Sequence, residues 1–283
     1  MSFEVLDPGP ATTVQDLGRP GYGAYGVPEG GAMDRGLLAA ANRLAGNRRQ
    51  LAALEFALKG PRLRWRGRAR LHCAVAADRI SPVTLAPDEE LGGEVLRQRA
   101  YGYIAVSGGF EVPLVMGGRG TCLPGGFGGF EGRELRQGDR LAVGESVSRP
   151  ERPARRSPGP LAAPGPSMSD LDPGHAVVRI LPGDRRVGNS TSFHALVDAE
   201  WRAGAGNRVG LRLEGPELHV RPIRLSQPIP PGAVQVTGAG QPIILLRDHP
   251  TVGGYPVVAV VAAADLDVCA QLRLGDSVRF VRL

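Results

Sequence analysis

The strongest pattern along the chain is an alternation of polar and apolar residues with a period of two. Between residues 62 and 71 every even position is arginine, and the odd positions run from Leu63 through Trp65 to Leu71. On a β-strand this period places the guanidinium groups on one face and the apolar side chains on the other. We interpret the arginine face as the solvated outer face of a sheet. A surface for acidic partners or phosphates is the alternative.

Three segments have the apolar spacing of helices instead. Asp34 can cap the first, whose apolar stripe begins at Leu37 and runs to Ala45, before Gly46 and Asn47 end it. Because only three such segments occur, and most other periodic stretches alternate with period two, the chain is expected to be mainly β with a few short helices.

The second and third helices are predicted in the other half of the chain. Asn189 or Ser190 can cap the second, and Asp265 opens a short third helix that ends near Leu272. One side of the second helix is expected to carry the apolar residues Phe193, Leu196, Val197 and Trp201.

Each half of the chain closes on a related phrase, Leu135-Arg-Gln-Gly-Asp-Arg-Leu-Ala-Val in the first and Leu272-Arg-Leu-Gly-Asp-Ser-Val-Arg-Phe in the second. A Gly-Asp turn that leads into an alternating apolar segment is typical of a last β-strand. Duplication of one β-rich unit is therefore a hypothesis.

The two halves are separated by a segment that disfavours regular structure. Residues 149–174 contain seven prolines and almost no bulky apolar residues, which makes a sheet or a packed core there improbable. The sequence predicts an N-terminal β domain at 1–148, a Pro/Gly-rich linker at 149–175 and a C-terminal β domain at 176–283. A long ordered loop within a single domain is the alternative.

Composition supports a chain rich in turns. The 283 residues include 41 glycines and 25 prolines, whereas aromatic residues make up 5%, which favours an all-β or α+β fold. The longest purely apolar run, residues 257–264, is far shorter than the roughly 20 residues of a membrane-spanning helix. The N-terminal residues also lack the pattern of a signal peptide.

Charge and cysteine usage narrow the function classes further. The net charge of +6 is spread along the chain, without the dense basic segment expected of a nucleic-acid-binding protein. Cys73, Cys122 and Cys269 lie far apart, so we expect reduced thiols and a cytoplasmic protein. The five histidines show no ligand spacing, so no metal site is predicted.

Glycine-rich segments offer the first candidate sites. Residues 21–26 match G-x-G-x-x-G, but no strand precedes them and no helix follows directly, so we interpret them as a turn-rich loop. Residues 125–132 would allow close approach of a ligand to the backbone, with Arg119 as a candidate anion binder. A flexible surface turn is an equal alternative for that segment.

A second candidate site follows an apolar strand in the C-terminal half. Residues 247–256 bring Asp248, His249, Thr251 and Tyr255 into one short loop, and loops at strand ends are common places for chemistry. Arg208, beside an earlier turn, is a candidate cation. Neighbouring Asp and His residues more often shape turns, so a structural role is the alternative.

Taken together, the motifs resemble the family called allophanate hydrolase subunit 2, or KipA, which includes the C-type subunit of the bacterial ATP-dependent 5-oxoprolinases. The segments that carry the resemblance span nearly the whole chain in family order: residues 8–21, 26–34, 41–47, 107–113, 125–133, 207–215, 231–236 and 253–256.

The resemblance implies two cyclophilin-like β-barrel domains and a partner, the B-type subunit that is also called KipI or allophanate hydrolase subunit 1. In 5-oxoprolinases a LamB/YcsF-type A subunit completes ring opening. The cofactor implied is ATP with Mg²⁺, which activates the lactam amide by phosphorylating its oxygen. In urea carboxylases of this family, carboxybiotin is the donor.

On this resemblance we expect the C-type subunit of an ATP-dependent 5-oxoprolinase-type complex, which activates a small cyclic amide for hydrolysis. From residue type, we assign catalytic roles to Asp248, as proton acceptor or metal ligand, and to Arg208. The residues assigned to substrate or phosphate binding are Arg119, Thr251, Gly253, Gly254 and Tyr255.

Three positions depart from the family pattern. Gly30 stands where the family usually has serine, Gln227 where it has aspartate and Val257 where it has lysine. Loss of a carboxylate and an ammonium group favours the alternative of a catalytically silent, KipA-like regulatory binding subunit. The resemblance to urea carboxylases implies a further alternative, a biotin-dependent carboxyltransferase subunit that acts on urea or a small amide, with biotin on another protein.

Overall fold

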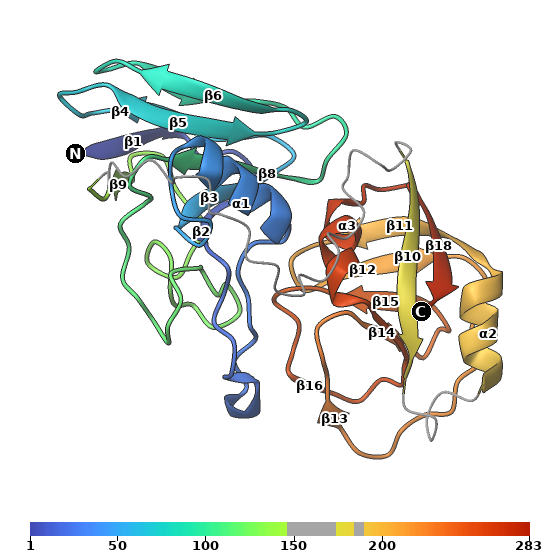
Figure 1. Ribbon diagram of the computed structural model, residues 1–283. Coiled ribbons are helices and arrows are strands. Elements are labelled where there is room, and N and C mark those ends of the chain that lie inside the picture. Colours follow the sequence, from blue (N-terminus) through green and yellow to red (C-terminus); the bar gives the residue numbers. More distant parts are fainter. Residues whose placement is uncertain (146–173, 184–189) are drawn as a thin grey trace, which may run out of the picture. The chain divides into compact units, whose positions relative to one another are not determined.

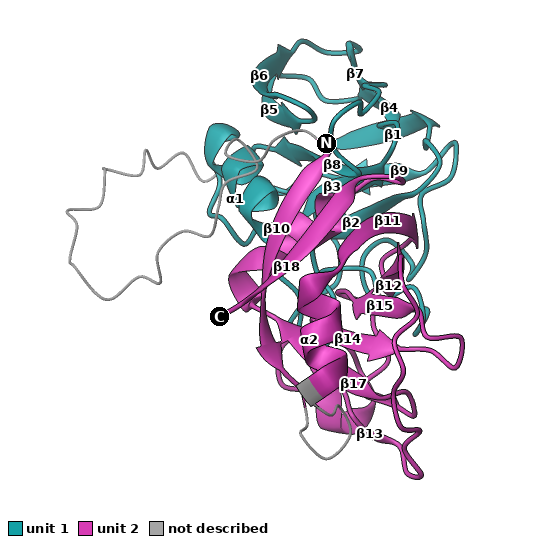
Figure 2. Ribbon diagram, turned by 90° about the vertical axis from the view of Figure 1, so that its right-hand side faces the viewer, with its two compact units in different colours: residues 1–19, 30–164 teal, residues 20–29, 165–283 magenta. Residues whose placement is uncertain are grey.

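The computed structural model describes residues 1–145, 174–183 and 190–283. Two compact units divide the chain: residues 1–19 with 30–164, and residues 20–29 with 165–283 (Figure 2). The α-helices in the described part are α1 (Arg35–Leu44), α2 (Ser190–Asp198) and α3 (Leu266–Gln271). The prediction of a mainly β fold with a few short helices is confirmed (Figure 1). Residues 149–173 of the predicted linker lie outside the described residues.

The first unit is built from two antiparallel sheets that share a core. Their strand orders are β7-β4-β1-β9 and β2-β3-β8-β5-β6. Phe3 and Trp65 from one sheet and Phe56 and Ile104 from the other are fully buried in one cluster. The strands are β1 (Ser2–Asp7), β2 (Thr12–Gln15), β3 (Ala53–Ala57), β4 (Arg62–Trp65), β5 (Leu71–Ala76), β6 (Ile80–Leu85), β7 (Glu90–Gly92), β8 (Tyr101–Val106) and β9 (Arg140–Ala142).

Helix α1 begins where the sequence predicts. The Asp34 side chain accepts a hydrogen bond from the Leu37 backbone N–H at 2.7 Å, which satisfies one of the free donors of the first turn. Leu38 and Ala41 are buried in a cluster with Tyr103 of β8. The amphipathic helix therefore covers the five-stranded sheet on the face away from the main core.

The predicted continuous strand from residue 62 to residue 71 is wrong. Strand β4 ends at Trp65 and β5 begins at Leu71. The indole N–H of Trp65 donates to the Ala69 carbonyl at 2.8 Å, and a Cβ on Gly67 would lie 2.0 Å from the Trp65 ring. The intervening residues therefore fold over the buried indole, and glycine is required at position 67.

The arginines of this region nevertheless face solvent. Arg62 and Arg64 of β4 both bind Glu90 of β7, with N–O distances of 2.8 and 2.7 Å, and Arg66 binds Glu4 at 2.8 Å. The interpretation as the outer face of a sheet is confirmed for Arg62 and Arg64, with acidic residues of the same unit as the ion-pair partners, whereas the arginines from residue 66 to residue 70 are exposed but lie between the strands.

The second unit contains a closed barrel of seven strands in the order β10-β17-β14-β15-β12-β11-β18. Strands β10 and β18 are parallel, and the other neighbours are antiparallel. A separate two-stranded sheet pairs β13 with β16. The strands are β10 (His175–Pro182), β11 (Glu200–Gly206), β12 (Gly210–Glu214), β13 (Gln227–Pro228), β14 (Ala233–Val236), β15 (Pro242–Leu245), β16 (Val252–Gly253), β17 (Val257–Val261) and β18 (Ser277–Arg282).

The two later helices largely follow the prediction. In α2, Phe193 and Leu196 are buried as expected, whereas Asn189 lies outside the described residues. The prediction that Trp201 lies on this helix is wrong, because Trp201 belongs to β11. It still packs near the helix, since its indole N–H donates to the Leu196 carbonyl at 2.9 Å. Helix α3 begins after Asp265, as predicted.

The same Gly-Asp turn precedes the last strand of each unit. Gly138 and Gly275 have φ values of 89° and 90°. The carboxylates of Asp139 and Asp276 each accept a hydrogen bond from the backbone N–H three residues earlier, at 2.7 and 2.8 Å. Strands β9 and β18 follow these turns, so the predicted closing strands are confirmed.

The part of the chain that the structure describes contains short helices and three buried cysteines. No helix there is long and apolar enough to cross a membrane. Cys73, Cys122 and Cys269 are buried free thiols. Burial raises the pKa of Cys73 to about 12, so this thiol stays protonated at neutral pH and is a poor nucleophile.

Candidate functional site

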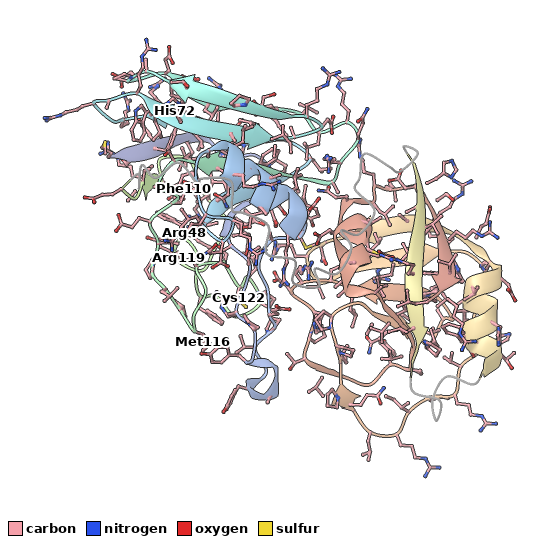
Figure 3. All side chains as sticks on the ribbon, in the orientation of Figure 1. Arg48, His72, Phe110, Met116, Arg119 and Cys122 are labelled. Carbon is pink, nitrogen blue, oxygen red and sulfur yellow. The ribbon has the colours of Figure 1, made fainter. Side chains whose placement is uncertain are left out.

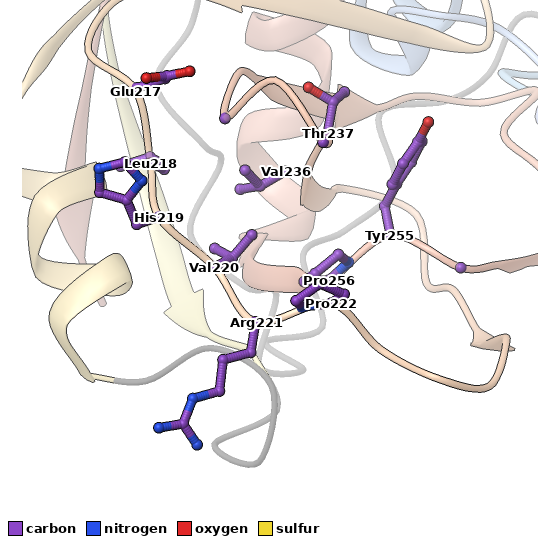
Figure 4. A pocket seen from close by; sticks show the side chains of 13 residues that line it. Glu217, Leu218, His219, Val220, Arg221, Pro222, Val236, Thr237, Tyr255 and Pro256 are labelled. Carbon is purple, nitrogen blue, oxygen red and sulfur yellow. The ribbon is translucent and has the colours of Figure 1, made fainter.

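A cavity of about 540 Å³ lies in the second unit (Figure 4). Its walls are residues 217–222 on one side and residues 236–238 with Gly240 on the other, and residues 254–256 complete it. Gly254 and Tyr255, two of the residues predicted from the sequence, therefore line the cavity. Its volume lies within the range of small-molecule sites, about 300–1,000 Å³.

The cavity combines apolar walls with a few polar groups. Val236 lies between Leu218 on one side and Thr237 on the other, and Val220 adds a second apolar group, whereas Arg221 points away from Thr237 and Tyr255 (Figure 4). Such a lining suits a small ligand that presents an apolar body and one or two hydrogen-bonding groups.

The turn beside the cavity is fixed by a buried glutamine. The Gln235 side chain donates from Nε2 to the Tyr255 carbonyl oxygen at 3.2 Å. A Cβ on Gly253 would lie 2.4 Å from Ile229 Cδ1 and 3.2 Å from Gln235 Nε2, so any side chain at this position would displace the ends of both neighbouring side chains. Gln235 was missed in the sequence analysis. Its signal was a polar residue in an otherwise apolar strand segment.

The departures at Gln227 and Val257 meet at this turn. Gln227 of β13 pairs with Gly253 of β16, and Val257 of β17 stands opposite Gln235 of β14. Val257 is buried in an apolar cluster with Ile229. The two positions where the family resemblance leads us to expect aspartate and lysine therefore adjoin the same turn and carry no formal charge here.

Arg208 and Asp248 form a bidentate ion pair in the second unit. Arg208 Nε lies 2.7 Å from Asp248 Oδ2, and its Nη2 lies 3.0 Å from Oδ1. The side chains are 10% and 1% exposed, and neither lines the cavity. The pair thus ties residue 208 to the loop that begins at residue 247. The catalytic roles assigned to these two residues stay predictions.

The neighbouring loop residues are held by the backbone. His249 Nδ1 lies 2.8 Å from the Pro250 carbonyl oxygen, and burial lowers the pKa of this imidazole. The Thr251 carbonyl accepts a hydrogen bond from the Ile229 N–H at 2.9 Å. Thr251 does not line the cavity, so its assignment to ligand binding remains a prediction.

Arg119 belongs to the first unit (Figure 3). The other six predicted residues belong to the second unit. The backbone N–H of Arg119 donates to Asp16 Oδ2 at 2.6 Å, and its guanidinium group donates to the Val112 carbonyl. Arg119 is therefore already hydrogen-bonded within its own unit.

Gly30, where the family usually has serine, also belongs to the first unit. Its φ of +61° is a conformation that disfavours serine.

Within the part of the chain that the structure describes, no group of three or more histidine, cysteine, aspartate or glutamate residues is placed to hold a metal ion. The chemistry this arrangement offers is hydrogen bonding and exclusion of water around a small ligand.

Comparison with known proteins gives full-length relatives. The chain is 35% identical over 301 residues to the C subunit of 5-oxoprolinase from Escherichia coli, covering 99% of this chain and 91% of the relative. The corresponding protein of Haemophilus influenzae is 34% identical, with 98% and 90% covered. The urea amidolyase of Lachancea kluyveri is 31% identical, but the match covers only 17% of it.

Solved structures share the fold. TTHA0988 has a TM-score of 0.83 and 31% identity, covering 99% of this chain. The urea amidolyase of K. lactis has a TM-score of 0.82 and 29% identity, covering 100%. The chain spans 56% of TTHA0988 and 19% of the urea amidolyase, so both contain further polypeptide.

The family assignment rests on a match over most of the chain. A model described as "Carboxyltransferase domain, subdomain A and B" matches residues 25–282. This range includes the cavity, the Gly253 turn and the Arg208–Asp248 pair. The chain therefore belongs to the family of carboxyltransferase domains, subdomains A and B.

Proposed function

We propose that this protein is the C-type subunit of an ATP-dependent 5-oxoprolinase-type complex in the cytoplasm. Together with a B-type subunit, it activates a small cyclic amide for hydrolysis, and a LamB/YcsF-type A subunit completes ring opening. The observation that carries the proposal is the pair of bacterial relatives that are named as the C subunit of 5-oxoprolinase, each matched over about nine-tenths of its own length.

The cavity supports a role in binding the amide. Thr237 and Tyr255 supply hydroxyl groups that can hydrogen-bond a carbonyl oxygen or an amide N–H, and Val220 and Val236 supply apolar walls. Gln235 holds the Tyr255 carbonyl and thereby orients the turn that carries the phenol. A lactam has this combination of a hydrocarbon ring and one polar amide edge.

The arginines predicted to bind phosphate already have hydrogen-bond partners in this chain. Arg208 is engaged by Asp248, and the Arg119 guanidinium donates to the Val112 carbonyl. Gly253 and Gly254 offer backbone, but Arg221 is the only cation that lines the described cavity, and it points away from its centre (Figure 4). We therefore assign the binding of ATP and Mg²⁺ to the assembled complex.

The experiment is an ATPase assay on the co-purified complex with 5-oxoproline. We expect 5-oxoproline to stimulate ATP hydrolysis with all subunits present and not with this chain alone. Tyr255→Phe, which removes one hydroxyl group from the cavity, should raise KM for 5-oxoproline. Absence of stimulation in the complete complex would refute the proposal.

Carboxyl transfer is the second candidate, favoured by the family description and by the urea amidolyase structure. In that case the substrate is urea or a small amide, and the biotin lies on another protein. Addition of a biotin carboxylase and a biotinylated carrier should then produce urea-dependent ATP hydrolysis, and 5-oxoproline should have no effect.

A silent, KipA-like regulatory subunit is the third candidate. The observation that favours it is the uncharged pair of positions, Gln227 and Val257, beside Gly253. Binding to the B-type subunit without turnover of either substrate would support this candidate. Gain of turnover in the double variant Gln227→Asp, Val257→Lys would show that these departures silence the site.

A further inference from the structure

The cavity of the second unit has one regular wall and one irregular wall. Residues 237–241 form a tight turn between β14 and β15, closed by hydrogen bonds from the Gly240 N–H to the Thr237 carbonyl at 2.9 Å and from the Thr237 N–H to the Gln241 carbonyl at 3.1 Å. Residues 217–222, which line the other side, belong to no helix or strand (Figure 4). Because an irregular segment lacks the repeated hydrogen bonds of a sheet, its position depends on a few individual contacts.

The irregular wall meets the turn at Leu218. The Leu218 N–H donates to the Gly240 carbonyl at 2.9 Å, and the Leu218 side chain is buried. Gly240 has a φ of +75°, and a Cβ there would lie 2.6 Å from Glu217 Cγ and 3.2 Å from the Leu218 backbone nitrogen. These contacts fix the start of the wall, which then continues without regular structure as far as β13 at Gln227.

A serine of helix α2 holds the next residue of the wall. The Ser192 hydroxyl donates to the His219 carbonyl oxygen at 2.8 Å. Ser192 is buried and lies in the first turn of α2, and the hydrogen bond joins positions 27 residues apart in the sequence. The hydroxyl group therefore connects the helix to the cavity wall.

Helix α2 is itself fixed to the barrel. Phe193 and Leu196 are buried, and the helix packs against β17 and β18. At its other end, the Leu196 carbonyl accepts the indole N–H of the fully buried Trp201 at 2.9 Å. A site is held most precisely when its supporting residues stand on such packed elements. The wall therefore takes its position at His219 from a rigid support.

We propose that Ser192 is a positioning residue for the cavity. Through the His219 carbonyl it holds the wall of residues 217–222 at the separation from Thr237 and Tyr255 that fits the substrate. This inference rests on the proposed function for the identity of that substrate, a small cyclic amide. Ser192 does not line the cavity, so its loss weakens substrate binding and leaves the chemical step unchanged.

The kinetic test compares Ser192→Ala with Thr191→Ala in the complete complex. Alanine favours the helical conformation, so α2 should persist in both variants. We expect Ser192→Ala to raise KM for 5-oxoproline about fivefold, the effect of one lost hydrogen bond, with kcat unchanged. Thr191→Ala is the matched control, because it removes a hydroxyl group from the neighbouring, exposed position of the same helix, and both constants should stay at their wild-type values.

Amide hydrogen exchange on the full chain measures the wall without any substrate. The Leu218 amide is protected by the Gly240 carbonyl and adjoins His219, so in Ser192→Ala it should exchange about fivefold faster. The Gly240 amide is bonded within its own turn and should exchange at the wild-type rate. Thr191→Ala should change neither amide.

The outcomes separate this inference from the proposed function. Unchanged KM and unchanged Leu218 exchange in Ser192→Ala overturn the positioning role, while stimulation of the wild-type complex by 5-oxoproline leaves the proposed function intact. A fall in kcat at unchanged KM also overturns the positioning role. If 5-oxoproline does not stimulate the wild-type complex, the proposed function fails, and the exchange of Leu218 then decides whether Ser192 holds the wall.

Discussion

Arginine–carboxylate pairs occur in both units with similar geometry but opposite surroundings. Arg208 and Asp248 of the second unit pair at 2.7 and 3.0 Å, and Arg62 and Arg64 of the first unit reach Glu90 at 2.8 and 2.7 Å. Of these pairs, only Arg208–Asp248 is almost fully buried. Solvent screening, rather than distance, therefore sets how much each pair contributes to stability.

The largest effect is expected at the buried pair. Asp248→Asn leaves the buried Arg208 guanidinium without its carboxylate, and we expect a loss of about 3–5 kcal/mol in the free energy of unfolding. Chemical denaturation with guanidinium chloride measures it. The double variant Arg208→Met, Asp248→Leu should be less destabilised than Asp248→Asn. A loss below about 1 kcal/mol for Asp248→Asn would contradict the assignment.

An intermediate effect is expected at His249, because burial lowers the pKa of its imidazole below the ordinary value of 6.5. The unfolded chain therefore binds a proton at a higher pH than the folded chain. The contribution of neutral His249 to the free energy of unfolding is therefore fully present above pH 6.5 and decreases as the pH drops toward the folded-state pKa. In His249→Gln the free energy of unfolding, measured by denaturation at several pH values, should depend less on pH in this range. His72→Gln, at an exposed histidine, is the control. An unchanged slope would contradict it.

The smallest effect is expected at Glu90. Hydrogen bonds from Arg62 and Arg64 lower the pKa of this exposed carboxyl, but water competes for all three groups. Glu90→Gln should leave the thermal midpoint within experimental error at neutral pH in 0.5 M salt. A shift comparable to that of Asp248→Asn would remove the distinction between the two sets of pairs.

Local signals predicted much of the fold. The Asp34 cap, the start of α3 and the two Gly-Asp turns depend on neighbouring residues, and each appears where the sequence indicates. The strand predicted through residue 71 failed because Trp65 donates to the Ala69 carbonyl. That contact bends the backbone without disturbing the alternation of residue types.

The candidate site depended on contacts between distant strands. The sequence indicated Gly254 and Tyr255, which line the cavity, but it could not show that Gln235 supports the turn. It also could not show that Gln227 and Val257 adjoin this turn, because strand register brings them together. Residue type suggested that Arg208 was available for a ligand, and only the structure shows its carboxylate partner.

The parallel pairing of β10 with β18 has a consequence for the order of folding. The paired residues, such as His175 and Ser277, lie about a hundred positions apart in sequence, and contacts of such separation carry a large entropic cost before they form. The antiparallel hairpin of β11 and β12 is local by comparison. We therefore expect the barrel to nucleate at short-range hairpins and to close last at the β10–β18 seam, so that formation of this seam limits the rate of refolding.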